Sequence, residues 1–541
     1  MRAGTAFFCL LLAFFPPLLL AEQENFGRVS RTLTALGIPF EERPLPDTYA
    51  SSILVRTGSA AETFVLAVPL EADFAVDVGL ALAEKAQSQD KPVSIMVAFL
   101  GGSQKPGGAE ESSGKGLRDL LTLADIPENW ILCYFDVAGS PKELVIRHGS
   151  LGYAAPLDVL RPLTSLLRSR GIPWSFRIRY NEIYRLGLAE SHQAVAIAWE
   201  REINSIALTA AYFPFDGLPD EADAEIVSPH EIAELLLEYA ASLDFPMLMV
   251  ENHYFFFVAP WGGDVVFFGE GLTVALLLIM TGICLLLFLV YSARYNAILL
   301  FHVRLFFKSA WIFLLLFSLM VVSIRASGLF YATLFRILGP PAGGGQSAQV
   351  YFTGAALTML LAVLVFFLHS PVFSKIRIPR RAEFYEFSSV ILLVMGLLAA
   401  AFIDFSFVPA FLWTFFFGFF AATLSKPLLV FLCIVLIPLF ALSALRNIIE
   451  TESIRIAEIF ISPEWRTLDA WLPAVMVALF CLPLILIVKR GIILTRKSLR
   501  LKSRPKSEYR LIVVSVLLFV ILAQMVAHIL LLPGAEGLHH R

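Results

Sequence analysis

Residues 63–86 read TFVLAVPLEADFAVDVGLALAEKA, and this stretch decides the fold of the first half of the chain. Its first part, Thr63 to Val68, is apolar and rich in β-branched residues, which predicts a strand. From Asp73 to Ala86 the apolar residues recur at helical spacing, which predicts a helix. A strand joined to a helix by a short loop is typical of an α/β sheet protein.

The same alternation of strand and helix patterns continues through the next 150 or so residues. Further strands are predicted at Ser52–Val55, Val93–Leu100, Ile131–Phe135, Leu144–Arg147 and Ser205–Thr209. Further helices are predicted at Gly116–Ala124, Leu157–Arg168, His192–Trp199 and His230–Ala241. This order predicts an α/β domain with a mainly parallel sheet and helices on both faces. Residues 253–258 and 265–268 read as a hairpin that leads into the second half.

The composition of the whole chain excludes an ordinary soluble protein. Of its 541 residues 57% are hydrophobic, only 16% are charged, and 47 are Phe. Residues 1–21, with Arg2 before an apolar run and Ala21 at the end, read as a signal peptide. Residues 22–264 have the charge density of a globular domain, and residues 265–541 are dominated by long apolar runs. The sequence therefore predicts an exported α/β domain followed by a polytopic membrane domain.

Eight apolar segments could each cross a hydrocarbon layer of about 30 Å, which predicts an all-α bundle of about eight helices. They are Phe268–Val290, Ala310–Ile324, Val350–Leu368, Ser388–Ile403, Phe407–Leu424, Leu428–Leu445, Trp471–Val488 and Leu511–Leu532. Lys and Arg gather in alternate loops, most densely at 489–510, which places those loops in the cytoplasm. A basic run next to apolar spans is more often a cytoplasmic loop than a nucleic-acid site, so no nucleic-acid partner is predicted.

The same orientation puts residues 22–264 and the C-terminus outside the cytoplasm. No Asn-x-Ser/Thr site occurs in the sequence, which favours a bacterial periplasm over a eukaryotic lumen. We therefore expect a multi-pass protein of the inner membrane with a periplasmic N-terminal domain. Membrane lipids and a membrane-protein complex are its expected partners.

Ligands of parallel sheets bind at the carboxyl ends of the strands, so the residues that follow each strand are the candidate site. Two stretches there, Phe135-Asp136-Val137-Ala138-Gly139 and Glu190-Ser191-His192, match the order of loops in a known family. A later run, Ile203 to Thr209, matches that family's Gly-Ile-Pro-Ala-Ile-x-Leu strand. On these motifs, residues 30–245 resemble the MH-clan zinc aminopeptidases. The resemblance implies an aminopeptidase fold of the phosphorylase/hydrolase-like type.

Carried over residue by residue, the resemblance implies that Asp136 would ligate one zinc ion and His192 the other. The family's first histidine falls on Val68 or Pro69, which cannot ligate through a side chain. Asp73 lies one residue from the position of the bridging aspartate. Directly after the third strand, Gly101-Gly102 stands where the family has a Glu pair.

A displaced match, Ala109-Glu110-Glu111, could restore part of the lost site. Glu110 would then be the general base, and Asp73, Glu111 and His192 would form a zinc site with one open position. Each residue also has a plain structural interpretation. Glu110 and Glu111 would be a solvated acidic pair, Asp136 a turn residue after a strand, and His192 a histidine at a helix start.

With the first histidine lost and the Glu pair displaced, we expect an inactive peptidase-like domain without a bound cofactor, although zinc remains an alternative. Such a domain would bind a peptide, a lipid-linked substrate or a partner near the membrane. By architecture alone the chain resembles the membrane-bound zinc aminopeptidases, and also the attachment subunit of the glycosylphosphatidylinositol transamidase. A reduced one-zinc hydrolase and a transporter with an accessory domain are the two alternatives.

Overall fold

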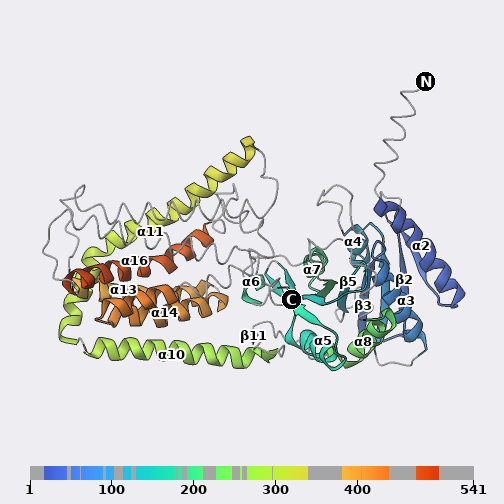
Figure 1. The fold of residues 1–541 in the computed structure, drawn as a ribbon, viewed down its shortest axis with the longest axis horizontal. Helices are drawn as coiled ribbons and strands as arrows, with labels where there is room; N and C mark the ends of the chain where they lie inside the picture. Colours follow the sequence, from blue (N-terminus) through green and yellow to red (C-terminus); the bar gives the residue numbers. More distant parts are fainter. Residues whose placement is uncertain are drawn as a thin grey trace, which may run out of the picture. The chain divides into compact units, whose positions relative to one another are not determined.

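The computed structural model forms two compact units, Met1–Thr273 and Val274–Arg541, and each is described by itself (Figure 1). The residues that the structure describes are 17–45, 50–60, 62–88, 93–102, 114–122, 130–150, 152–177, 181–185, 192–210, 227–245, 256–258, 265–294, 296–338, 381–403, 405–437 and 471–498. Two of the predicted spans, Val350–Leu368 and Leu511–Leu532, lie outside these residues, as do Glu110 and Glu111.

An eight-stranded sheet forms the centre of the first unit, in the order β1-β2-β4-β3-β5-β10-β6-β9. Its strands are β1 (Glu41–Pro44), β2 (Ser51–Thr57), β3 (Thr63–Pro69), β4 (Ser94–Leu100), β5 (Trp130–Asp136), β6 (Leu144–Arg147), β9 (Trp174–Phe176) and β10 (Asn204–Ala210). The four central strands β4, β3, β5 and β10 run parallel. β2 pairs antiparallel with both β1 and β4, and β6 pairs antiparallel with β10. The α/β class is confirmed, but the sheet is mixed rather than mainly parallel.

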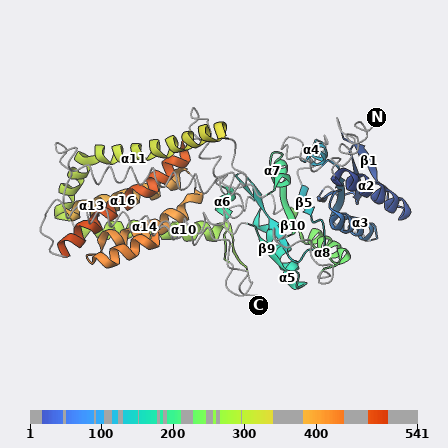
Figure 2. The ribbon, with the colours of Figure 1, turned by 45° about the horizontal axis from the view of Figure 1, so that its top comes forward.

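Helices lie on both faces of this sheet (Figures 1 and 2). They are α2 (Pro17–Ala35), α3 (Asp73–Gln87), α4 (Lys115–Leu121), α5 (Leu157–Ser169), α6 (Asn181–Arg185), α7 (Gln193–Trp199) and α8 (Pro229–Ser242). The crossover β3-α3-β4 leads to the neighbour of β3 on the β2 side of the sheet. The crossover β4-α4-β5 leads in the opposite direction, past β3 to its other neighbour. Right-handed crossovers in opposite directions place α3 and α4 on opposite faces. Every residue of β3 and β4 is therefore buried, as in a sheet covered on both sides.

Helix α2 belongs to the folded unit and runs through the predicted cleavage point after Ala21. Val29 and Leu33 lie in the core, and the polar side chains of Glu22 and Asn25 are also buried. The short strands β7 (Gly149–Ser150) and β8 (Tyr153–Ala154) form a separate pair. The predicted hairpin is present as β11 (Phe256–Val258) and β12 (Val266–Phe268), which pair antiparallel. Signal cleavage itself stays a prediction.

In the second unit, four described helices are long and apolar enough to cross a membrane: Glu270–Ala293, Val303–Ala326, Ala382–Ile403 and Ala474–Thr495. They belong to α10 (Glu270–Arg294), α11 (Asn296–Leu338), α13 (Ala382–Ile403) and α16 (Leu472–Ser498). Two shorter apolar helices, α14 (Val408–Thr423) and Pro427–Ile437, fall on two further predicted spans. The predicted number of eight is thus not supported by the described residues, which hold four helices of spanning length and these two shorter ones.

Four helices of the second unit are joined at one end by a buried polar network. Arg490 of α16 donates to Glu386 of α13 at 2.9 Å, and to the carbonyl oxygens of Ala421 and Leu424 at 3.2 and 2.7 Å. Tyr291 of α10 donates its hydroxyl to the other oxygen of Glu386 at 3.1 Å. The sequence prediction that placed Arg490 in a basic loop is therefore wrong, because the helix continues past it and its side chain is only 4% exposed.

A second arginine lies toward the start of α16. Arg325 of α11 is buried, and its guanidinium carbon is 5.5 Å from the centre of the Trp471 ring. A cation over an indole face is attracted by the negative potential of the ring, which compensates part of the cost of burying the charge. The α16 helix is thus tied to its neighbours near both of its ends.

Candidate functional site

The structure brings together two of the five predicted site residues, Asp136 and His192. Asp136 is the last residue of β5, where it lies in register beside Thr209 of β10. His192 is the N-cap of α7, the helix that precedes β10. Nε2 of His192 is 3.5 Å from Oδ2 of Asp136, and the two side chains are 18% and 25% exposed. The pair lies at the carboxyl ends of parallel strands, as predicted.

Both ring nitrogens of His192 have a neighbour. The backbone N–H of Ala194 donates to Nδ1 at 3.1 Å, which caps the helix. In a neutral imidazole one nitrogen donates and the other accepts, so the proton must lie on Nε2 and face Asp136. The ring also packs against Tyr134, with 4.9 Å between the ring centres. The interpretation of His192 as a helix-start histidine therefore describes what its side chain does here.

The carboxylate of Asp73 accepts a hydrogen bond from Asn25. Nδ2 of Asn25, from α2, donates to Oδ1 of Asp73 and to the carbonyl oxygen of Leu70, both at 2.7 Å. The first free N–H groups of α3 are also used: Phe74 donates to Ala138 at 3.3 Å and Ala75 to Val137 at 3.0 Å. These carbonyls fill the positively polarised start of α3, where an anion could otherwise bind.

Directly after β4, Gly101 and Gly102 stand where the resemblance implies a Glu pair. The carboxyl group found at this place is that of Glu22, from helix α2. The N–H of Gly102 donates to Oε1 of Glu22 at 2.7 Å. Burial raises the pKa of the Glu22 carboxyl above its usual value, and the bond from Gly102 opposes this shift. A Cβ on Gly101 would lie 2.6 Å from the Ser51 carbonyl oxygen and 2.7 Å from Oε1 of Glu22, so only glycine fits there.

The residues brought together do not by themselves fit a zinc ion. The position of the family's first histidine is filled by Val68 and Pro69 within β3, and Val68 is fully buried. Within the described ranges, no three His, Cys, Asp or Glu side chains lie close enough to hold a metal ion. Asp136 and His192 are two donors, whereas a catalytic zinc has three protein ligands. The placements of Glu110 and Glu111 stay predictions.

Sequence reasoning missed Glu22, Asn25 and Tyr134. Glu22 and Asn25 come directly after an apolar run, so they read as the start of a mature chain rather than as parts of a site. Tyr134 could have been found, because residues two apart on a strand point to the same face, and Asp136 follows it at that spacing.

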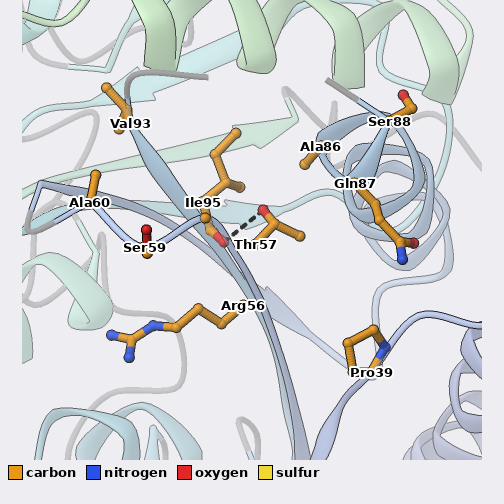
Figure 3. A pocket seen from close by; sticks show the side chains of 11 residues that line it. Pro39, Arg56, Thr57, Ser59, Ala60, Ala86, Gln87, Ser88, Val93 and Ile95 are labelled. Carbon is orange, nitrogen blue, oxygen red and sulfur yellow. Dashed lines mark hydrogen bonds between the residues drawn. The ribbon is translucent and has the colours of Figure 1, made fainter. Parts of the chain in front are cut away.

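A separate cavity of about 580 Å³ lies at the other end of the sheet (Figure 3). Thr57 at the end of β2 pairs with Ile95 at the start of β4, so this cavity is at the amino ends of the central strands. It is lined by Arg56, Gln87 and Ser88, with an apolar part that includes Ala86 and Val93. The Thr57 hydroxyl donates to the Ile95 carbonyl at 3.2 Å. The cavity is therefore not part of the Asp136–His192 site.

Three comparisons with known proteins bear on the two units. A family model described as "TP_0564_2nd: family, second domain" matches residues 310–527. No curated protein matches the chain. Solved structures that are similar to it include the LapA aminopeptidase of Legionella pneumophila, with 10% identity over 42% of this chain and 65% of that chain, and a TM-score of 0.32. The chain thus spans less than two thirds of the length of LapA.

Two further structures have similar values. A glutaminyl cyclase of Tannerella forsythia is 12% identical over 40% of this chain and 89% of its own, with a TM-score of 0.30. A Zn-dependent exopeptidase of Parabacteroides distasonis is 12% identical over 42% of this chain and 88% of its own, with a TM-score of 0.28. These three structures are of an aminopeptidase, a glutaminyl cyclase and a Zn-dependent exopeptidase, and similarity at this level assigns no activity to this chain.

Proposed function

We propose that the first unit is a binding or scaffold module at a membrane and does not act as a metallopeptidase. The observation that carries this proposal is that two predicted zinc ligands, His192 and Asp73, are each held by another part of the fold. To ligate zinc through Nε2, the ring would have to move its proton to Nδ1 and release the N–H of Ala194. His192 then serves as a helix cap, with Asp136 facing its remaining N–H.

The free energies of a helix cap and of a zinc site differ by about tenfold. Losing an N-cap costs about 1 kcal/mol, whereas a complete structural zinc site contributes about 10–16 kcal/mol. A complete ligand set would therefore overcome the cap. What supports a metal-free module is the combination of the cap with the lost first histidine and with Asp73 held by Asn25. A peptide, a lipid-linked substrate or a partner protein in a complex is the proposed ligand of this unit.

The proposed setting is the bacterial inner membrane, with the first unit outside the cytoplasm. Four helices long and apolar enough to span a bilayer support a membrane protein. The distribution of Lys and Arg in the sequence supports the orientation.

Zinc content tests the proposal directly. The full-length protein, purified in detergent, is incubated with zinc, passed through a desalting column and assayed for bound metal and for aminopeptidase turnover. We expect no tightly bound zinc and no turnover, with identical results for His192→Asn and for the exposed-histidine control His230→Asn.

Two outcomes would overturn the proposal. Bound zinc that is lost in His192→Asn but kept in His230→Asn would make His192 a ligand. Zinc that is lost in Glu111→Ala, together with turnover that is lost in Glu110→Ala, would establish the reduced one-zinc hydrolase instead.

The transporter alternative has one observation in its favour, the buried pair of Glu386 and Arg490 in the membrane helices. Ionisable groups within spans often mark transport paths. Here the Arg490 guanidinium also binds two carbonyl oxygens at the end of α14, which favours a fixed structural contact over a moving one.

A further inference from the structure

The buried network around Arg490 brings together the ends of four helices of the second unit, so these ends lie at the same height along the bundle. Tyr291 lies near the end of α10, Glu386 near the start of α13, Leu424 just after α14, and Arg490 near the end of α16. Phe313 of α11 lies at nearly the same height, because it stacks on Phe384 of α13 with 5.9 Å between ring centres. Side chains slightly farther out on these helices therefore surround one end of the bundle.

Five of these side chains are exposed and basic. They are Arg304, Lys308, Arg381, Lys426 and Lys497, and we call them the basic collar. Arg381 precedes Glu386, Lys426 follows Leu424, and Lys497 follows Arg490. On α11, Arg304 and Lys308 both precede Phe313, the residue that stacks on Phe384. None of the five forms an ion pair with another described residue, and Glu383 is the exposed acid nearest to them in sequence.

The other ends of the same helices carry few charges. Among the described residues, they hold Glu270 at the start of α10, the buried Arg325, and Arg336 on the extension of α11. The described helices are therefore strongly positive at one end and carry few charges at the other.

Exposed aromatic side chains accompany the collar on α11. Phe307, next to Lys308, is 71% exposed, and Phe301 and Trp311 are 56% and 47% exposed. Basic and aromatic residues together at the limit of an apolar span are typical of the zone where lipid headgroups meet hydrocarbon. Three residues of the collar, Arg304, Arg381 and Lys497, lie within two residues of an end of the apolar windows Val303–Ala326, Ala382–Ile403 and Ala474–Thr495.

We propose that the basic collar is a binding surface for anionic phospholipid headgroups. Its charge is complementary to a lipid phosphate, and its level sets it beside the headgroups rather than in free solution. Near an anionic surface each Lys or Arg contributes roughly a fivefold gain in affinity, since about 1 kcal/mol is gained per charge. This proposal concerns the second unit and does not depend on the proposed function of the first.

Lipid retention tests the proposal. The full-length protein is reconstituted in nanodiscs of phosphatidylcholine mixed with phosphatidylglycerol, released into detergent, and the retained lipids are counted by native mass spectrometry. We expect preferential retention of phosphatidylglycerol. The triple variant Arg381→Gln, Lys426→Gln, Lys497→Gln should lower that preference by up to about a hundredfold at low salt.

A matched control removes three exposed charges from the first unit, Arg31→Gln, Arg161→Gln and Arg201→Gln. It should retain the preference of the unaltered protein. Raising the salt from 0.15 M to 1 M shortens the screening length from about 8 to 3 Å and should weaken the preference. Equal retention of both lipids, an unchanged preference in the collar variant, or an equal loss in the control would each overturn the proposal.

Discussion

Replacing His192 by asparagine or by alanine separates a capping role from a metal-binding role. Asparagine can accept the N–H of Ala194 and is a favoured N-cap, whereas alanine cannot. Both variants lose the ring contact with Tyr134, worth about 0.5–1.5 kcal/mol. Only the alanine variant also loses the cap, worth about 1 kcal/mol. We expect His192→Ala to be less stable than His192→Asn by about 1 kcal/mol.

For a unit of this size, that difference corresponds to about 2–4 °C in melting temperature. Thermal unfolding of the full-length protein measures it, and hydrogen exchange of the α7 amides shows whether the loss is local. The Ser228 hydroxyl caps α8 in the same way, accepting from Glu231 at 3.2 Å, so Ser228→Ala gives a matched reference for the cost of a lost cap. Equal losses in His192→Asn and His192→Ala would refute the capping role.

Three further predictions concern packing and charge. Arg490→Gln leaves Glu386 buried without its cation and should cost about 3–5 kcal/mol, and adding Glu386→Gln should recover part of that loss because it removes the unpaired charge, as measured by unfolding in mixed detergents. Gly116→Ala should cost about 1–3 kcal/mol in thermal unfolding, because its Cβ would collide with the Gly101 carbonyl oxygen, whereas Gly139→Ala, with open space around it, should not. The raised pKa of Glu22 means that the folded state holds its proton more tightly than the unfolded state, so stability should fall as the pH rises from 4.5 through the folded pKa. Glu22→Gln should remove that fall in a pH series of melting temperatures, and an unchanged slope would contradict it.

The regular elements of the first unit could be predicted because their patterns are strong. The predicted strands at 63–68 and 131–135 fall within β3 and β5, and the predicted helix at 73–86 corresponds to α3. The edge strand β1 was missed, since Glu41-Glu42-Arg43-Pro44 has no apolar alternation. The direction of β2 was also missed, because a strand pattern does not state which way the chain enters the sheet.

The site was predictable in place but not in detail. Asp136 and His192 could be placed at one sheet edge because each is next to a recognisable element. The contacts of Asp73 could not be predicted, since its partner Asn25 is distant in sequence and lies beside an apolar run that resembles a signal. Arg490 was misplaced for a similar reason: its partner Glu386 is on another helix, and the residues after it are dense in charge.

The two arginines tied to α16 have a consequence for the lipid environment. From Leu472, beside the Trp471 that faces Arg325, to Arg490, the helix rises roughly 27 Å at 1.5 Å per residue. This length is close to the hydrocarbon thickness of a typical bilayer, about 30 Å. The separation of the two polar contacts along α16 therefore suits a bilayer of one particular hydrocarbon thickness. In lipids with longer chains, we predict that the bundle tilts less or thins the surrounding bilayer, so that both polar contacts stay near the limits of the hydrocarbon.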